Sequence, residues 1–493
     1  MSHLPRSSRA VPLRALAAVA AIAVFVSCNS DRPLAPPTGD RLSVCHLSGS
    51  SRSLVQMYAS ELPVHWQPGD YVAGLVVDRQ STQVGDGIHY SRIGDAVAAA
   101  RALRVARNET ETAPCRITIT VAPGVFAGST TESADPTLES FPIVLDFPDL
   151  TLLGAMRMQV DEQGRAIGTS DGGQVTTLSP TPALLKQPGL ASEPIIVVNA
   201  HPNGSKGYGI TIEGFAFRSG HMGVDELVAG QGILALRARD LVVRGNRFEG
   251  GFTESIDLRS SSGLVERNHL KGRGGSCDVC LSGPGDYRAR DNLLIEGGIP
   301  GFLIVPGTLL PVPSGIEQDV LPTMSLVTAT VINNEVRDHL SKPVGAGLRL
   351  GAIGIGAPSV SGSTRVVASG NTLVNNTFNL IVEAAFPEAN TTLRGDIDLQ
   401  LSDNTLAQAC QNDVLVSFSR HTTGLGLTNA GRANSPYLRS STYRLALDYP
   451  MRWEDAWFSH PAGFDNTLIV DGKVIPNGSR TAYDASRTCA PLP

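Results

Sequence analysis

The amino-acid sequence predicts an all-β solenoid, in which short strands stack coil upon coil around one long apolar core. Three observations predict this class. Short apolar strands recur at a constant interval, an asparagine follows the second strand of each repeat, and no helical pattern separates the repeats. A period of roughly 20–50 residues that contains only strands is typical of stacked coils.

Each repeat opens with a short strand that carries an apolar residue at the same position. In the centre of the chain these positions lie 23 residues apart, and insertions lengthen the later intervals. The positions are Ile233, Ile256, Val279, Phe302, Leu348, Leu380 and Val414. Because side chains alternate between the two faces of a strand, these residues are expected to face the core and the next residues to face outward.

A second strand follows in each repeat and ends in an asparagine. These residues are Asn246, Asn268, Asn292, Asn334, Asn371 and Asn404. A carboxamide both donates and accepts hydrogen bonds, so identical amides stacked in successive turns satisfy one another. We therefore predict a structural asparagine ladder along one edge of the solenoid.

These repeats resemble those of the right-handed parallel β-helix superfamily, which includes pectate lyases and polygalacturonases, over roughly residues 85–472. The resemblance implies parallel sheets joined by turns in which asparagines stack, and it is specific for the fold and not for an activity. Upstream, Ile117–Val121 is similar to the family's opening strand, and residues 211–215 place Gly214 at the ladder position.

A helix is predicted at the start of the solenoid, over residues 91–107, with Ser91 as its N-cap. Its apolar residues lie at helical spacing. They are Ile93, Ala96, Val97, Ala100 and Leu103. The end of a solenoid exposes an apolar coil and unpaired strand edges, so we expect this helix to cap it.

Residues 1–27 are predicted to form a lipoprotein signal peptide. Arg6, Arg9 and Arg14 precede an apolar stretch, residues 15–26, that is too short to span a bilayer. Cys28 follows Ser27 as in a bacterial lipobox, a resemblance that implies lipidation of Cys28; the alternative is an ordinary secretory signal. We expect an exported lipoprotein of the outer membrane or cell surface, held to the membrane only by its lipid.

Four further segments follow the signal peptide. Residues 28–41 are rich in proline and are predicted to be a tether, and residues 42–84 form a small N-terminal module. The β-helix with its capping helix is expected over residues 85–430. Residues 431–493, where the repeat pattern ends, are predicted to form a C-terminal capping region.

Six cysteines besides Cys28 are disulfide candidates, because exported proteins form disulfides. They are Cys45, Cys115, Cys277, Cys280, Cys410 and Cys489. Their positions suggest Cys45 with Cys115 and Cys410 with Cys489, while Cys277 and Cys280 either pair locally or stay reduced. No second ligand pair follows Cys277 and Cys280, so no metal site is predicted.

Any chemistry is expected on the outward face of the repeated strands, where the resemblance places the active sites of the family's enzymes. Asp257 and Arg259 face outward from one strand, and Glu254 and Lys271 are contributed by its flanking turns. These four residues are the candidate catalytic group. The competing interpretation is that Asp257 and Arg259 simply pair with each other.

A cofactor is not expected. A calcium site of the pectate-lyase kind needs several carboxylates, and the outward column around Asp257 supplies only one. The motifs of the family's hydrolases and esterases are absent from the sequence. The chain has a formal net charge of −6 and no basic runs, which argues against nucleic acid as a partner.

Three functions remain open on the sequence. The first is a lipid-anchored envelope protein that binds a polysaccharide or another envelope component. The second is a carbohydrate-active enzyme, a lyase or a hydrolase, with its site on the outward face of one parallel sheet. The third is a structural spacer or adhesin stalk. The candidate site has a single outward carboxylate and lacks the motifs of the family's enzymes, which favours the first function.

Overall fold

The computed structural model describes a mostly β chain with one long helix near its N-terminus. The described residues are 41–48, 51–58, 74–84, 87–106, 116–129, 138–169, 174–180, 194–199, 208–219, 230–272, 277–297, 300–306, 325–339, 353–356, 362–383, 397–409, 412–417, 442–447, 456–459, 467–470 and 473–475. The predicted lipidation site Cys28 and three disulfide candidates, Cys115, Cys410 and Cys489, lie outside them.

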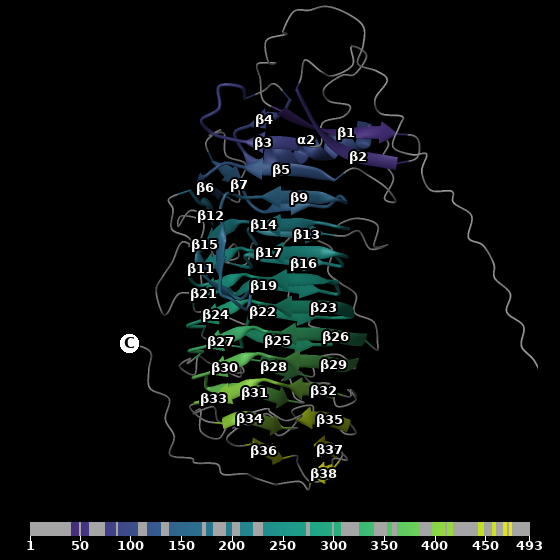
Figure 1. Cartoon of the computed structure of the whole chain (residues 1–493), viewed down its shortest axis with the longest axis vertical. Helices are drawn as coiled ribbons and strands as arrows, with labels where there is room; N and C mark the ends of the chain where they lie inside the picture. The colour runs from purple at the N-terminus through teal and green to yellow at the C-terminus, as the bar shows by residue number, and fades with distance from the viewer. Residues whose placement is uncertain are drawn as a thin grey trace, which may run out of the picture.

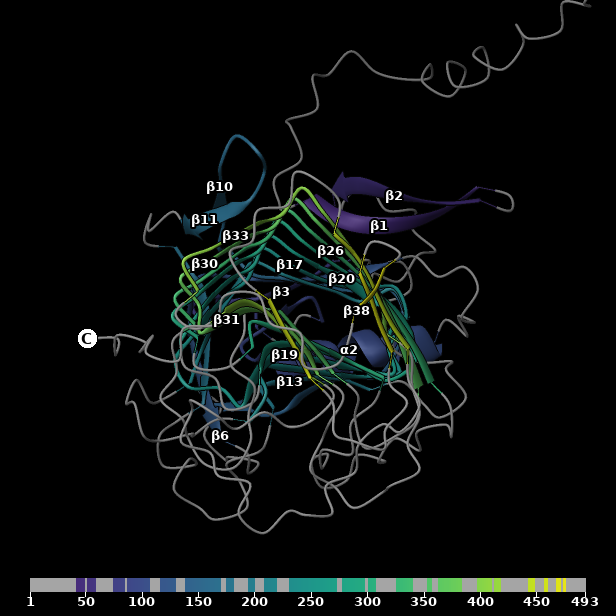
Figure 2. The ribbon, with the colours of Figure 1, turned by 90° about the horizontal axis from the view of Figure 1, so that it is seen from below.

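The fold is a parallel β-helix, as predicted. Three long sheets run side by side along the whole solenoid (Figure 1). Viewed along the axis, the strands of successive coils lie over one another around a common interior (Figure 2). We number the sheets 1, 2 and 3. Sheet 1 is the longest, and in each coil the chain passes from sheet 1 to sheet 2 and then to sheet 3.

Sheet 1 is parallel except for its last pair, β37 with β38. Its strands, in pairing order, are β4 (His89–Tyr90), β3 (Gly74–Val77), β5 (Ile117–Val121), β9 (Leu150–Leu153), β14 (Thr211–Glu213), β17 (Leu241–Arg244), β20 (Gly263–Glu266), β23 (Gly285–Arg290), β26 (Ser325–Ile332), β29 (Gly362–Ser369), β32 (Ile397–Ser402), β35 (Thr442–Leu447), β37 (Thr467–Val470) and β38 (Lys473–Ile475).

Sheets 2 and 3 are parallel throughout. Sheet 2 contains β7 (Glu139–Ser140), β6 (Gly124–Ser129), β12 (Thr176–Pro180), β15 (Phe215–Arg218), β18 (Arg247–Glu249), β21 (His269–Lys271), β24 (Leu293–Ile295), β27 (Glu335–Arg337), β30 (Thr372–Val374) and β33 (Thr405–Ala407). Sheet 3 contains β8 (Ile143–Leu145), β13 (Ile196–Asn199), β16 (Ile233–Leu236), β19 (Glu254–Arg259), β22 (Cys277–Ser282), β25 (Phe302–Val305), β28 (Ile353–Gly356), β31 (Phe378–Glu383), β34 (Asn412–Ser417) and β36 (Ala456–Ser459).

The predicted interval of 23 residues separates equivalent positions in successive coils of sheet 3. Ile233 lies opposite Ile256, Ile256 opposite Val279, and Val279 opposite Phe302. All four side chains are fully buried in the core. Apolar side chains are therefore stacked at the same depth in successive coils, which holds the register.

One strand of the predicted series is misplaced. The sequence assigned the coil after Phe302 to Leu348, but the structure pairs Phe302 with Ile353 and Ile353 with Leu380. The outward residue of this coil is therefore Gly354, and Arg349 lies outside the described residues. In the sequence, residues 347–350 and the residues of β28 both alternate apolar residues with other residues, as a strand does. Because insertions vary in length, the spacing does not decide which of the two segments pairs with Phe302.

The turn between sheets 1 and 2 contains the asparagine ladder. Each described asparagine accepts a hydrogen bond at Oδ1 from the backbone of the preceding coil and donates from Nδ2 to a strand carbonyl. Asn268, for example, accepts from the Asn246 backbone N–H at 3.0 Å and donates to the Val243 carbonyl at 2.9 Å. Asn246, Asn268, Asn292, Asn334, Asn371 and Asn404 are all at most 2% exposed.

A residue with positive φ precedes each ladder asparagine, and it turns the chain from sheet 1 into sheet 2. Small or hydrogen-bonding side chains favour this left-handed conformation, and Gly245, Asp291 and Asn333 supply it in three coils. Gly214 has the same role, because the next residue, Phe215, donates its backbone N–H to Asn246. The ladder position predicted for Gly214 therefore belongs to Phe215.

Helix α2 (Ile93–Ala106) lies at the N-terminal end of the solenoid, as predicted, against strands of the first coils (Figure 1). Its core-facing side chains are those that the spacing identified. Ile93, Ala96, Val97 and Ala100 are buried and join the main core, and Leu103 packs against it.

The N-terminus of α2 is capped by a distant residue. Glu139 is fully buried and its carboxylate accepts the N–H groups of Ile93 at 2.7 Å and Gly94 at 3.0 Å. The sequence had assigned this role to Ser91. Burial raises the pKa of the Glu139 carboxyl, and these two hydrogen bonds oppose the rise because they favour the charged form.

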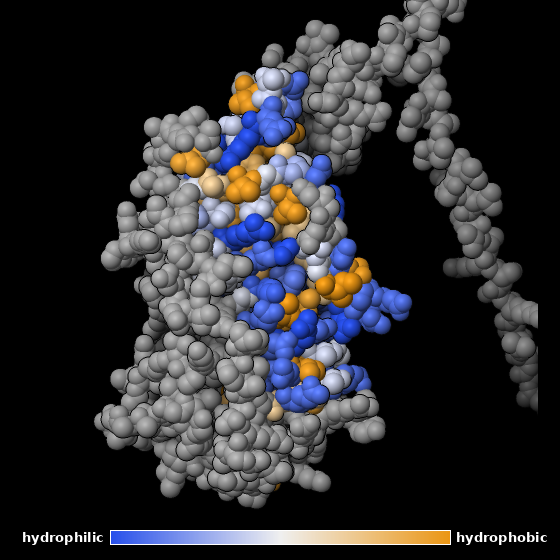
Figure 3. Space-filling view, turned by 90° about the vertical axis from the view of Figure 1, so that its left-hand side faces the viewer, coloured by the Kyte–Doolittle hydropathy of each residue, from blue (hydrophilic) through white to orange (hydrophobic). Residues whose placement is uncertain are grey.

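Two antiparallel hairpins lie outside the ring of sheets (Figure 2). The first is β1 (Arg41–Ser48) with β2 (Ser51–Tyr58), and the second is β10 (Met158–Val160) with β11 (Ala166–Thr169). The second covers part of sheet 2, where Ala166 packs on β24. Around it, hydrophobic residues form small separate groups among hydrophilic ones (Figure 3).

The stacking continues beyond residue 430. β35 pairs in parallel with β32, and β36 pairs in parallel with β34. β38 then turns back against β37. Among the described residues, no helix is both long enough and apolar enough to cross a membrane.

Candidate functional site

The candidate catalytic residues of β19 lie on the outward face of sheet 3. Ile256 and Leu258 point into the core, so Asp257 and Arg259 point to the other face of the sheet. This face is not open: Asp257 is 0% and Arg259 is 3% exposed. Both side chains are therefore covered by the protein.

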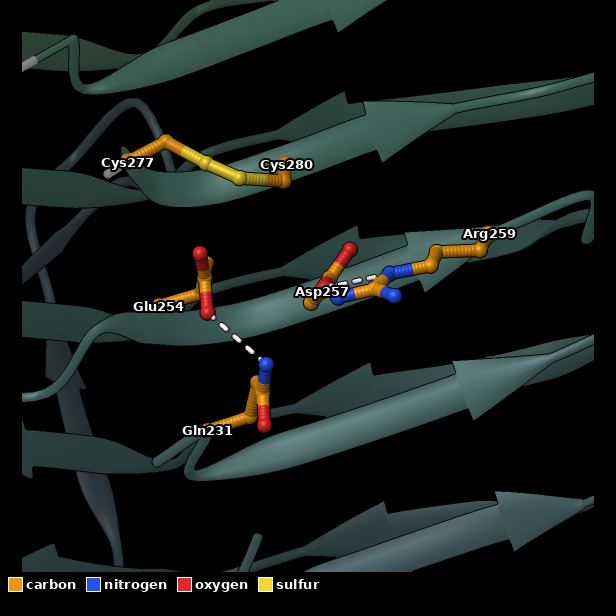
Figure 4. Close-up of a disulfide and its surroundings, with 6 residues drawn as sticks. All are labelled: Gln231, Glu254, Asp257, Arg259, Cys277 and Cys280. Atoms are coloured by element: carbon orange, nitrogen blue, oxygen red, sulfur yellow. Dashed lines mark hydrogen bonds and ion pairs between the residues drawn. A yellow bond between two sulfur atoms is a disulfide. The ribbon is translucent and has the colours of Figure 1, made fainter. Parts of the chain in front are cut away.

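Asp257 and Arg259 form a buried ion pair (Figure 4). The Asp257 Oδ2 atom accepts from Arg259 Nε at 2.8 Å and lies 2.6 Å from Nη2. Both contacts therefore fall on one carboxylate oxygen. The other oxygen, Oδ1, points away from Arg259 toward β22.

The two remaining candidates are placed differently. Glu254 is buried at the start of β19 and accepts a hydrogen bond at Oε2 from Gln231 Nε2 at 2.9 Å (Figure 4). Lys271 lies on sheet 2, where its Nζ is 3.3 Å from Oε1 of Glu296. Glu254 thus shares the outward face of sheet 3 with the ion pair, and Lys271 does not.

A disulfide joins Cys277 and Cys280 beside the ion pair (Figure 4). Their Cα atoms are 5.7 Å apart, and both residues are buried in β22. Cys280 lies opposite Asp257, and Ser282 lies opposite Arg259. The local pairing, which the sequence had left open, ties the start of β22 to its middle next to Asp257.

Among the described residues of sheet 3 and its edge, four buried oxygen atoms at this face have no hydrogen-bond partner. They are Asp257 Oδ1, Ser282 Oγ, Gln231 Oε1 and, at the end of β13, Asn199 Oδ1. A buried polar atom without a partner typically costs about 1–3 kcal/mol, so such atoms are rare in folded proteins. These atoms lie on or beside neighbouring strands of sheet 3, and each of them can accept a hydrogen bond.

The surroundings of these oxygens are aliphatic on the described side. Leu234 lies opposite Asp257 on β16, and Leu236 lies opposite Arg259. Both are fully buried, and Val305 of β25 is buried opposite Ser282. The site therefore combines one carboxylate oxygen, one hydroxyl and one guanidinium with apolar walls.

This arrangement is suited to binding more than to acid–base catalysis. Hydrolysis of a glycoside needs two carboxyl groups on either side of the bond that breaks. Here Glu254 is hydrogen-bonded to Gln231, Asp257 is paired with Arg259, and the base Lys271 belongs to another sheet. Among the described residues, no group of three or more histidine, cysteine or acidic side chains is placed to hold a metal ion.

Sequence reasoning missed several polar residues near this face. Gln231 was not singled out, because a single polar residue beside a strand carries no signal in the pattern. Asp278 and His339 were also missed, and they form a buried pair with 2.8 Å between Oδ2 and Nε2. They are 61 residues apart, and only the stacking of coils brings them together.

No protein-family model matches the chain, and no curated protein matches it. Among solved structures, the A-module of the mannuronan C-5 epimerase AlgE4 from Azotobacter vinelandii is similar to it at 14% sequence identity and a TM-score of 0.31. The alignment covers 78% of this chain and 86% of that module. At this identity and TM-score, the likeness carries no argument about activity.

Proposed function

We propose that the chain is an exported envelope protein that binds a polysaccharide at the outward face of sheet 3, around Asp257. The observation that carries this proposal is the buried Asp257 Oδ1, which has no partner although Arg259 occupies the other oxygen of the same carboxylate. A hydroxyl group that donates to Oδ1 would remove the cost of leaving it unpaired.

A sugar residue supplies the groups that this site lacks. Its hydroxyls donate to Asp257 Oδ1 and exchange hydrogen bonds with Ser282 Oγ, the two unpartnered atoms nearest the ion pair. Its C–H faces fit against aliphatic side chains, which Leu234 provides on the adjacent strand β16 and Leu303 provides two strands away on β25. Polar groups that fix orientation within apolar walls are typical of small-molecule sites.

We favour binding over a hydrolase and over a structural spacer. An enzyme of the hydrolase kind would need a second carboxylate with a free oxygen facing Asp257, and Glu254 is instead bonded to Gln231. A spacer has no use for a buried carboxylate with an unpartnered oxygen, since apolar residues would stabilise that face as well or better.

Binding is tested with a glycan array that includes neutral and acidic polysaccharides, probed with the full chain in detergent. For a glycan that binds, Ser282→Ala is expected to weaken the affinity about tenfold, which corresponds to one lost hydrogen bond of roughly 1.4 kcal/mol. Ser369→Ala, on the outward side of sheet 1, is the matched control and should bind as wild type does. Binding to no glycan, or equal affinity for both variants, would contradict the proposal.

Anchoring at the envelope is proposed from the sequence, since Cys28 lies outside the described residues. Cys28→Ser is expected to move the protein from the membrane fraction to the soluble fraction, because lipidation needs the thiol. Fractionation of cells that produce each form measures this. A Cys28→Ser protein that stays in the membrane fraction would favour another mode of attachment.

A further inference from the structure

The corner between sheets 2 and 3 holds a buried pair of titratable residues that the proposed binding site does not use. Asp278 lies between the two disulfide cysteines in β22, and His339 follows β27. Asp278 is 3% and His339 is 1% exposed. The imidazole fills the space beside Gly297, where a Cβ atom would come within 2.3 Å of the ring.

Both ring nitrogens of His339 face hydrogen-bond acceptors. Nε2 lies 2.8 Å from Asp278 Oδ2, and Nδ1 lies 3.1 Å from the backbone carbonyl of Arg337. The carbonyl has no proton to give, so Nδ1 carries one and donates it. The contact with Asp278 then needs a second proton, either on Nε2 or on the carboxyl group.

We propose that Asp278 and His339 share this second proton and act as a pH-sensitive lock between sheets 2 and 3. With the proton present, the pair is neutral overall and both hydrogen bonds exist, whichever residue carries the proton. When it is lost, one of the two contacts becomes acceptor against acceptor, in whichever tautomer the ring adopts. The corner then opens, because a buried contact of that kind is repulsive.

Within the part of the chain that the structure describes, the neighbouring groups do not supply another proton or another counter-charge. The backbone N–H of His339 donates to Asn376 Oδ1 at 3.0 Å, and Thr377 donates to the His339 carbonyl. Among the charged residues on the packed elements, the Arg337 side chain pairs with Glu335 and Asp338, and Glu296 pairs with Lys271. Glu254, opposite Cys277, accepts from Gln231.

The expected direction of the pH dependence follows from the carboxyl group. Burial raises the pKa of Asp278, and the hydrogen bond and charge of His339 oppose the rise. A carboxyl group whose pKa is raised by folding contributes stability fully below the ordinary value of about 4, and this contribution is lost as the pH rises through the raised value. A rise in pH through the raised pKa of Asp278 should therefore loosen this corner.

The test compares wild type with Asp278→Asn from pH 5 to pH 9. The asparagine amide donates to Nε2 without a titratable proton, so both contacts of the ring persist at every pH. Wild type is expected to lose on the order of 2 °C in Tm across this range because of the pair, and Asp278→Asn is expected to lose less by that amount. Asp161→Asn, in the β10–β11 turn, is the matched control and should keep the wild-type dependence.

Hydrogen exchange of the wild-type protein provides a second measurement that needs no variant. Peptides that cover residues 277–282 and 335–339 should lose protection as the pH rises, after correction for intrinsic exchange, while peptides from β17 should not. The same pH dependence of Tm in wild type and Asp278→Asn would overturn the proposal. So would protection of both corner peptides that is independent of pH, even if the variant does not fold.

Discussion

Replacement of Asp257 by alanine is expected to lower the free energy of unfolding by about 3–5 kcal/mol, the usual cost of removing one partner from a buried ion pair. Arg259 would remain in an environment where it is 3% exposed, without the carboxylate that now lies 2.6 Å from its Nη2. Denaturant unfolding at neutral pH, followed by circular dichroism, measures this change.

The double variant Asp257→Leu with Arg259→Met separates the charge from the packing. Two apolar side chains of similar size leave no unpaired charge, so the double variant should be close to wild type in stability and well above Asp257→Ala. If Asp257→Ala and wild type have the same free energy of unfolding, then Asp257 is not buried as an ion pair. If the stable double variant keeps full glycan affinity, the ligand binds elsewhere on the solenoid.

Replacement of Asn268 by alanine is the second large effect, a loss of about 2–3 kcal/mol. The carboxamide accepts from the N–H and Nδ2 of Asn246 and donates to the Val243 carbonyl and to Asn292. Alanine leaves the Asn246 N–H and the Val243 carbonyl buried without these partners. Unsatisfied groups of this kind typically cost roughly 1–3 kcal/mol each, and the relaxation of adjacent coils recovers part of that cost.

Asn199→Ala is the control for this substitution. Asn199 ends β13 outside the ladder, and its carboxamide oxygen has no hydrogen-bond partner. Its replacement removes no described side-chain hydrogen bond, so the free energy of unfolding from a thermal melt should stay within about 0.5 kcal/mol of wild type. Equal losses for Asn199→Ala and Asn268→Ala would mean that the ladder amides contribute nothing special to the stack.

The parts of the fold that were predictable are those in which each coil repeats the chemistry of the last. Ile233, Ile256 and Val279 lie at one depth in the core because a parallel stack places equivalent residues over one another. The asparagines could be recognised for the same reason, since an amide in the turn is satisfied by its copy in the next coil. Repetition makes these features visible in a single sequence.

The parts that were not predictable depend on contacts between residues that no period relates. Glu139 caps a helix that begins 46 residues earlier in the chain, and nothing in its neighbourhood marks it for that role. The choice of β28 over residues 347–350 was also out of reach, because both segments alternate correctly and only the pairing with Phe302 and Leu380 decides between them.

The candidate site divides along the same line. Strand alternation in the sequence was enough to place Asp257 and Arg259 together on the outward face, because residues two apart in a strand share a face. Only the tertiary structure decided that this face is buried and that Lys271 lies on another sheet. Burial and neighbours across strands depend on which coils stack against which, and a local pattern does not contain that information.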